Sequence, residues 1–274
     1  MTLVVNTNKS SLTSQRLLNN ATSGLATSYE RLASGLRINR AADDAAGLVI
    51  SNTLTSQVNG LDQAVRNAND AISLVQVSEG GLEEIQTGLQ RLRVLTIQSG
   101  NGINSAANID ALQQEFDELT ATIQNIADNT EFGGIKLLDG SAMAAVFQIG
   151  ANAGQKISIE LSTAFGSDGS GLNIASIALG TDDIADTLQR LDGALLTVDS
   201  ARTEFGSLQN VLETTIRNLS NISENVSASR SRIRDTDYAK ETSGLTRSQI
   251  IQQSSITVLT QANQRPQAAL SILG

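Results

Sequence analysis

Residues 184–226 read IADTLQRLDGALLTVDSARTEFGSLQNVLETTIRNLSNISENV, and every seventh position of this stretch is apolar. These positions are Ile184, Leu191, Val198, Phe205, Leu212, Leu219 and Val226. A helix that repeats an apolar side chain every seven residues buries one stripe against another helix. Polar residues interrupt the second register of this stripe at Arg202, Gln209 and Ser223. The stretch predicts one long helix, over about 181–227, that packs in a helical bundle.

Two earlier segments carry the same kind of repeat. Apolar residues alternate at spacings of four and three from Leu54 to Val75, and the stripe continues, shifted, from Leu82 to Leu92, which predicts a helix over about 43–99. A shorter set runs over 109–126. The stretch between them, SGNGINSAAN, is rich in glycine and small polar residues. The chain can turn back there. The two segments predict an antiparallel helical hairpin.

Residues 131–180 have a different composition, because nine of the 22 glycines of the chain lie there. The sequence has an apolar run at 146–149 and a strict alternation at 156–161. Both patterns are typical of short strands, and glycines between them suit a turn. We expect one or two β-hairpins at the end of the helical rod.

The sequence predicts one helix at each end of the chain, and each of these helices carries a stripe of apolar side chains that it is unable to bury alone. We expect the two terminal helices to lie side by side and to bury their stripes on assembly. The candidate residues of this inner-layer assembly are Leu18, Leu25, Leu32, Leu245, Ile251, Val258 and Leu259. The single proline, Pro266, is expected to end or kink the last helix.

The fold class that follows is mainly α. A long coiled-coil-like bundle forms a central rod over 43–230, with a small β-hairpin region at 131–180. A discontinuous terminal-helix layer is built from residues 1–42 and 231–274.

Composition excludes several classes of function. The sequence has no histidine and no cysteine. The usual triads, thiol nucleophiles and zinc sites therefore have no bases or ligands. We expect no catalytic residue, no metal, no cofactor and no enzymatic activity.

Charge and hydropathy exclude two further classes. The net charge is −9, which disfavours nucleic-acid binding. A membrane span needs about 20 apolar residues in a row, and no stretch approaches that length. Composition alone would place the chain in the cytoplasm.

Two stretches place arginines just before aspartates, ASGLRINRAADDAAG at 33–47 and RSRIRDTD at 230–237. Adjacent side chains on a helix point in different directions, which disfavours a shared catalytic or metal site. We expect an inter-layer joint, with two acids in the first turn of the long helix. Its charges either pair with one another or stay solvated. The candidate joint residues are Arg37, Arg40, Asp43, Asp44, Arg230, Arg232, Arg234, Asp235 and Asp237.

Ordered motifs cover nearly the whole chain. They include NTNKSSLTSQRLLN, ERLASGLRINRAADDAAGLVIS, RNANDAISLVQVSEGGL, LQRLRVLTIQS, ADNTEFGGIKLLDG, SASRSRIRDTDYAKETSGLTRSQIIQQSS and QANQRPQAALSIL. In this order they resemble the two terminal regions of bacterial flagellins. Only the short segment 131–180 lies in the middle, so the chain is similar to a short flagellin without large outer domains.

The resemblance implies a layout and a location. Paired terminal helices would form an inner tube, and the long helices would form the layer around it. The chain would leave the cell unfolded through the flagellar export apparatus, without a cleaved signal peptide, and become extracellular. Implied partners are other copies of itself, the export apparatus, a secretion chaperone, the filament cap and hook-junction proteins.

The resemblance also implies a patch for an innate immune receptor of a host. The matching residues are Arg91, Leu95 and Glu115, whereas Val94 stands where many relatives have an acid. The other reading of these residues is contact between subunits.

The function expected from these observations is a structural subunit that assembles into the flagellar filament for motility. One alternative in the same axial family is a hook–filament junction protein. Alternatives of another class are an exported enzyme-bearing flagellin and an adhesin or receptor ligand. We expect the terminal helices to be disordered in the monomer and to order on assembly.

Overall fold

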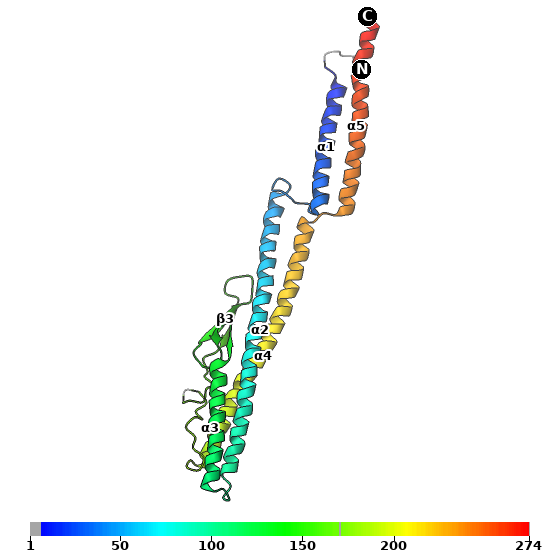
Figure 1. The fold of residues 1–274 in the computed structure, drawn as a ribbon. Helices are drawn as coiled ribbons and strands as arrows, with labels where there is room; N and C mark the ends of the chain where they lie inside the picture. The colour runs from blue at the N-terminus through cyan, green and yellow to red at the C-terminus, as the bar shows by residue number, and fades with distance from the viewer. Residues whose placement is uncertain (1–6, 170, 274) are drawn as a thin grey trace. The chain divides into compact units, whose positions relative to one another are not determined.

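The computed structural model describes the backbone of residues 7–169 and 171–273, and the side chains up to residue 264. The chain forms two compact units, residues 1–56 with 225–274 (the terminal unit) and residues 57–224 (the central unit). The helices are α1 (Lys9–Ser34), α2 (Ala45–Ser99), α3 (Ala106–Asn129), α4 (Ile184–Arg234) and α5 (Tyr238–Leu273) (Figure 1). The strands are β1 (Glu131–Phe132), β2 (Ile135–Lys136), β3 (Ala144–Gln148) and β4 (Lys156–Glu160). The mainly helical fold with a small hairpin region is confirmed.

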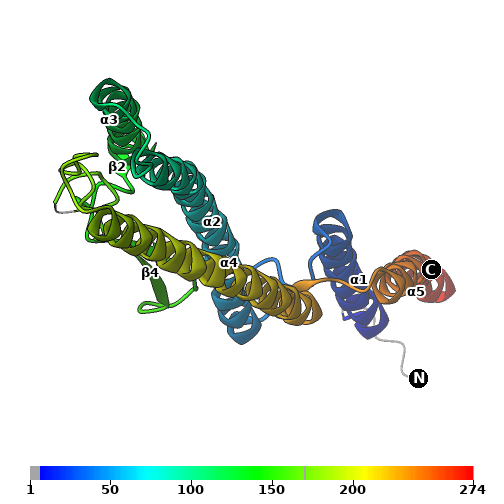
Figure 2. The same ribbon diagram turned by 90° about the horizontal axis from the view of Figure 1, so that it is seen from below.

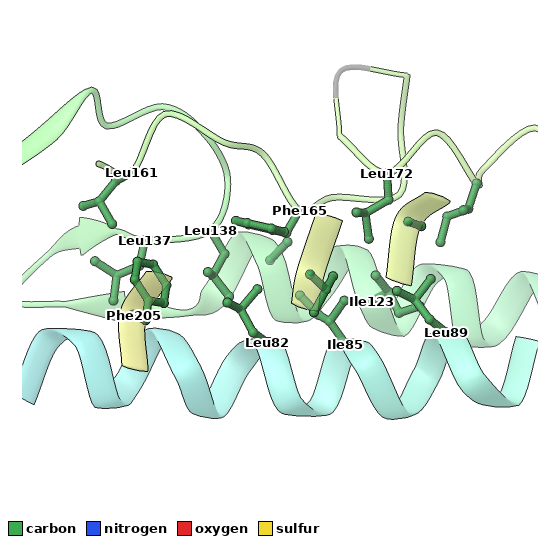
Figure 3. Close-up of a cluster of buried hydrophobic side chains, with 14 of the residues drawn as sticks. Leu82, Ile85, Leu89, Ile123, Leu137, Leu138, Leu161, Phe165, Leu172 and Phe205 are labelled. Atoms are coloured by element: carbon green, nitrogen blue, oxygen red, sulfur yellow. The ribbon is translucent and has the colours of Figure 1, made fainter. Parts of the chain in front are cut away.

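The central unit is built on an aliphatic core shared by α2, α3 and α4. α3 runs back along α2, and loop residues between β2 and α4 cover the seam between them (Figure 3). The core side chains at this seam are fully or almost fully buried. They include Leu82, Ile85, Leu89, Ile123, Leu137, Leu138, Leu161, Phe165, Leu172 and Phe205. Burying one such leucine removes enough apolar surface from water to contribute roughly 1.5–3 kcal/mol.

The seven-residue register of α4 coincides with burial through most of its length. Leu191, Val198, Phe205, Leu212 and Leu219 are all buried. All three polar residues that interrupt the second register reach acidic partners on α2, and Arg202 does so through an ion pair with Glu79 at 3.8 Å. Gln209 donates to Glu79 at 2.8 Å, and Ser223 donates to Asp62 at 3.2 Å. These interruptions are therefore cross-helix polar contacts at the edge of the stripe.

Two antiparallel hairpins follow α3. β3 pairs with β4 from Ala144 opposite Glu160 to Gln148 opposite Lys156, which confirms the predicted hairpin. The second hairpin joins β1 to β2 through Gly133 and Gly134, both with positive φ. A two-residue loop with this conformation favours glycine, so the pair of glycines in FGGI was a usable signal for this hairpin.

In the terminal unit, α1 and α5 lie side by side (Figures 1 and 2). Small side chains fill the seam, with Ser14, Ala21, Ser28 and Ser255 buried there. A Cβ added at Gly24 would come within 3.3 Å of the Ser248 hydroxyl, so the two helices approach closely. Leu25 is the larger apolar residue of α1 that this seam buries.

Three predicted helix limits need correction. α2 begins at Ala45, two residues later than expected, because Asp44 caps it from outside. α4 continues past residue 227 to Arg234, since SASRSRIR has no residue that breaks a helix. α5 passes through Pro266 to Leu273, so of the two expected effects of Pro266 the end of the helix is wrong, and the kink stays a prediction. A proline removes one backbone hydrogen bond without preventing the chain from continuing as a helix.

The core predicts a sharp contrast between two leucines of the central unit. Leu89 is fully buried, so Leu89→Ala leaves a cavity among α2, α3 and the covering loop. Such a cavity should lower the free energy of unfolding by about 2–5 kcal/mol. Leu196 is 70 % exposed. Leu196→Ala should therefore change the free energy of unfolding by less than about 0.5 kcal/mol.

Urea unfolding followed by circular dichroism measures both variants. Equal effects of the two substitutions would contradict the core described here.

Candidate assembly site

The joint in the terminal unit is held mainly by backbone hydrogen bonds. Gly35 ends α1 in the left-handed conformation, with φ of 72°. The Arg37 amide donates to the Arg234 carbonyl at 2.7 Å, and the Thr236 amide donates to the Gly35 carbonyl at 2.9 Å. Leu36 and Asp235 form a β-bridge. The segments 33–47 and 230–237 therefore meet, as the mirrored motifs suggested.

Arg37 and Ile38 anchor this joint to the end of α4. The Arg37 guanidinium donates to the Ile233 carbonyl through Nη2 at 2.5 Å and Nε at 3.2 Å. Cationic donors at the carboxyl end of a helix satisfy its free carbonyls and meet the negative end of its dipole. Ile38 is almost fully buried, which fixes the loop from the other side.

The two adjacent aspartates have separate roles. The Asp43 carboxylate accepts from the Asn39 and Arg40 amides at 3.0 and 2.9 Å, which closes the loop before α2. These two hydrogen bonds, from Arg40 and then Asn39, lower the pKa of Asp43 despite an opposing effect of desolvation. The Asp44 carboxylate accepts from the Gly47 amide at 2.8 Å. Asp44 is therefore the N-cap of α2.

The prediction that both aspartates lie in the first turn of α2 is wrong, since the helix begins after them. An aspartate at the N-cap accepts from a free amide of the first turn, whereas one inside the first turn interacts mainly with the positive end of the helix dipole. The sequence pattern fits either position equally well.

In the part of the chain that the structure describes, no arginine of these motifs forms an ion pair with one of their aspartates. Among the described residues, the ion pairs at the joint are Arg40–Glu30 and Arg31–Glu241. Arg40 holds Glu30 through two bonds of 2.8 and 2.9 Å, and Glu241 also accepts from Ser28 at 2.6 Å. Sequence reasoning missed both glutamates, although Glu30 opens the ERLASGLRINR motif.

The remaining joint residues lie on the last turns of α4 and in the short connection to α5. Asp237 caps α5 by accepting from the Ala239 and Lys240 amides at 3.0 and 3.1 Å. Arg232 is exposed, and Arg230 and Arg234 are half-buried. The Arg234 Nε is buried without a hydrogen-bond partner in the described part of the chain.

The candidate inner-layer residues divide between the helix seam and the surface. Leu25 is buried, whereas Leu18, Leu32, Leu245 and Leu259 are half-buried and Ile251 and Val258 are exposed. Further exposed apolar side chains outside the predicted set are Leu12, Leu17, Ile250 and Ile256. An open groove of about 270 Å³ runs among Ser14, Leu17, Ile250, Ile251, Ser254, Ser255 and Val258. The terminal unit therefore presents apolar side chains that its own two helices leave uncovered.

The predicted receptor patch is only partly at the surface. Arg91 of α2 binds Glu115 of α3 at 2.5–2.9 Å, and both side chains are exposed. Leu95 has 0 % exposure and belongs to the core, so its predicted place in a contact surface is corrected. It continues the apolar stripe of α2 that the core buries. The exposed apolar neighbour is Val94.

Neither a membrane-spanning helix nor an acidic metal cluster occurs among the described residues. Within them, no helix combines the length and apolar character that spanning a bilayer requires. Nor does the described part contain a cluster of three acidic, histidine or cysteine residues arranged to hold a metal ion.

Comparison with known families agrees with this architecture. The family description "Bacterial flagellin N-terminal helical region" matches residues 5–143, and "Bacterial flagellin C-terminal helical region" matches residues 188–273. Both descriptions are of the flagellin family, and the chain belongs to it. It is a structural subunit of the bacterial flagellar filament, which is extracellular and self-assembling.

Two relatives and one solved structure illustrate the range of similarity. Flagellin B of Vibrio cholerae is 38% identical, and the alignment covers 100% of both chains. A flagellin of Halalkalibacterium halodurans is 45% identical over 89% of this chain and 90% of the relative. A putative flagellar hook-associated protein from Vibrio parahaemolyticus has a TM-score of 0.60 at 14% identity, over 70% of this chain and 100% of that one. The last is a likeness of fold alone.

The role of Asp43 predicts a loop that is sensitive to acid. The folded pKa of Asp43 lies below the ordinary value. Its bonds therefore stabilise the loop above the ordinary aspartate pKa of about 4, and this stability is lost as pH falls through the lower folded value. The amide proton shifts of Asn39 and Arg40 should change together at acid pH. Nuclear magnetic resonance titration measures this change.

Asp43→Asn should abolish this titration, because an amide oxygen still accepts but carries no charge to neutralise. Asp235→Asn is the matched control in the same joint, and it should leave the Asn39 and Arg40 titration unchanged. The same titration in Asp43→Asn and in the unmodified chain would contradict the assignment.

Proposed function

We propose that the terminal unit makes the main contacts between subunits of the filament. The observation that carries the proposal is the exposed apolar surface of α1 and α5. Soluble monomers rarely leave such side chains together without a partner, and copies of one chain in a helical polymer cover them repeatedly. The exposed and half-buried members of the candidate inner-layer set, with Leu12, Leu17, Ile250 and Ile256, are the side chains that become buried.

The joint then serves to hold the start of α2 and the end of α4 against the α1–α5 pair. The hydrogen bonds from Arg37 and the Arg40–Glu30 pair support this role within the terminal unit. Residues 1–42 with 231–274 form one layer of the filament in this proposal, and residues 43–230 form the other. The proposed joint residues are those of the two mirrored motifs.

The mechanism we propose is nonenzymatic. Two observations support it. The sequence contains no histidine and no cysteine, and the exposed surface of α1 and α5 carries apolar side chains. Export without a cleaved signal peptide, in an unfolded state, is part of the same proposal. The further partners are the export apparatus, a secretion chaperone, the filament cap and hook-junction proteins.

Recognition by an innate immune receptor is a second candidate function. The exposed Arg91–Glu115 pair supports it, because both charged side chains are accessible on the central unit. Leu95 contributes only by placing α2 in the core, and Val94 is an apolar surface residue. Receptor activation is measured with the purified monomer and with its Arg91→Ala variant. This candidate function requires that the monomer activates the receptor and that the substitution reduces the activation.

The assembly proposal predicts a variant that folds but does not polymerise. Ile250→Ser with Val258→Ser removes two side chains that are 59 % and 51 % exposed, so the monomer should unfold as before. Polymer yield should fall strongly, because each fully buried aliphatic side chain contributes about 1.5–3 kcal/mol. Sedimentation and electron microscopy measure polymer yield and filament form.

Leu196→Ser is the control on the central unit, where it removes a comparably exposed aliphatic side chain. It should leave filaments intact. Normal filaments from the Ile250→Ser/Val258→Ser variant would contradict the proposal, as would failure of the unmodified chain to form filaments at all.

Charge predicts how salt affects assembly. Residues 1–56 and 225–274 hold 11 Lys and Arg against 6 Asp and Glu, whereas residues 57–224 hold 8 against 22. If like units meet in the polymer, like charges repel at both contacts. Sodium chloride weakens this repulsion by shortening the screening length to about 10 Å at 0.1 M. Polymer yield should therefore rise with sodium chloride.

A series in chloride salts avoids the separate effect of sulfate on apolar burial. Polymers that dissolve as chloride rises would contradict this arrangement and show that oppositely charged units face each other.

A further inference from the structure

The turn between α2 and α3 contains a chemically labile pair of residues. The sequence has two Asn-Gly pairs, Asn59-Gly60 and Asn101-Gly102. The first lies inside α2, and the second lies just after it, in the turn that leads to α3. The chain therefore holds the same reactive dipeptide in two conformations, and each serves as a reference for the other.

Asn101 is the first residue of a solvent-exposed turn. Its carbonyl accepts from the Asn104 amide at 3.0 Å, and its side-chain oxygen accepts from the Ile103 amide at 3.4 Å. The asparagine side chain thus folds back over the backbone that follows it, as in an Asx turn. The side-chain amide carbon of Asn101 and the Gly102 nitrogen are joined through the intervening backbone, so a bond between them closes a small cyclic imide.

The attacking group is unrestrained. Within the described chain, the Gly102 amide makes no hydrogen bond, and a Cβ built at Gly102 would meet no atom within 4 Å. Asn101 and Gly102 are exposed, and the next residue, Ile103, is 85 % exposed. Water reaches both residues, and the absent glycine side chain offers no steric barrier.

We propose that Asn101 is a site of spontaneous deamidation. The Gly102 amide nitrogen, after loss of its proton to solvent, forms a bond to the side-chain amide carbon of Asn101. The bond from that carbon to Nδ2 breaks, and ammonia leaves with a proton from solvent. Water then opens the resulting cyclic imide at either carbonyl, which gives aspartate or isoaspartate without any oxidant or enzyme.

Asn59-Gly60 is protected by the helix that contains it. There the Gly60 amide bonds to the carbonyl four residues earlier, and ring closure needs a backbone conformation that an α-helix does not provide. A Cβ at Gly60 would lie 3.1 Å from the Ala151 side chain, so the loop between β3 and β4 packs against this turn of α2. Reaction at Asn59 requires local opening of α2.

The modification adds negative charge to the central unit, and isoaspartate also lengthens the backbone of the turn by one carbon. The open surroundings of Gly102 let the turn absorb this change without moving the core. Deamidated Asn101 should therefore accumulate with time in copies of the chain that remain folded.

The test compares the two pairs in one folded sample. Purified protein is incubated at mildly alkaline pH, digested, and analysed by mass spectrometry, with a protein-isoaspartate methyltransferase as the probe for isoaspartate. The peptide holding Asn101 should convert at least ~10-fold faster than the peptide holding Asn59. In denaturant the two rates should converge.

Gly102→Ala is the matched variant, because the added methyl group hinders ring closure while meeting no neighbour. It should slow conversion at Asn101 and leave the circular dichroism spectrum and Asn59 unchanged. Equal rates at the two sites in the folded protein, faster conversion at Asn59, or an unaltered rate in Gly102→Ala would each overturn the proposal.

Discussion

The structure depends on the burial of one aliphatic stripe along α4 against α2. Leu191, Val198, Phe205 and Leu212 pack with the inward side chains of α2, and α3 with its covering loop completes the enclosure. The chain has few aromatic residues. This core therefore gains its stability from the number of aliphatic contacts and from their regular spacing. The hairpins and the loop after β2 are held in place by the same core.

The joint lies beyond this aliphatic core, and hydrogen bonds to backbone groups hold it together. At the joint, Arg37 satisfies a carbonyl at the end of α4, Asp43 closes a loop and Asp44 caps α2. Exposed ion pairs contribute only ~0–1 kcal/mol each, so such pairs alone would not fix this region. Hydrogen bonds from charged side chains to backbone groups also fix the direction in which the chain leaves one helix and enters the next.

Periodicity made the central unit predictable from the sequence, because the seven-residue register of α4 and the alternation at 156–161 both express burial directly. The joint was located through its repeated Arg and Asp residues, but its bonds were not foreseen. Which acid meets Arg40 depends on how α1 ends and turns, and the partner, Glu30, lies ten residues away. The burial of Leu95 was readable from the sequence, because it lies three residues after Leu92 on the apolar stripe of α2.

The terminal unit differs from the central one in what covers its apolar residues. Its seam is made mainly of serine, alanine and glycine around Leu25, while Ile250, Ile256 and Val258 remain exposed. Such a pair of helices gains little by folding alone and more by meeting other copies. We therefore expect the folding of α1 and α5 to be coupled to assembly.

Hydrogen exchange of the monomer and of the filament tests this coupling most directly. We predict rapid exchange across residues 9–34 and 238–264 in the monomer and slow exchange of the same amides in the filament, with the amides of α2 around Leu89 slow in both. Slow exchange of α1 and α5 in the monomer would contradict the claim that assembly completes their folding.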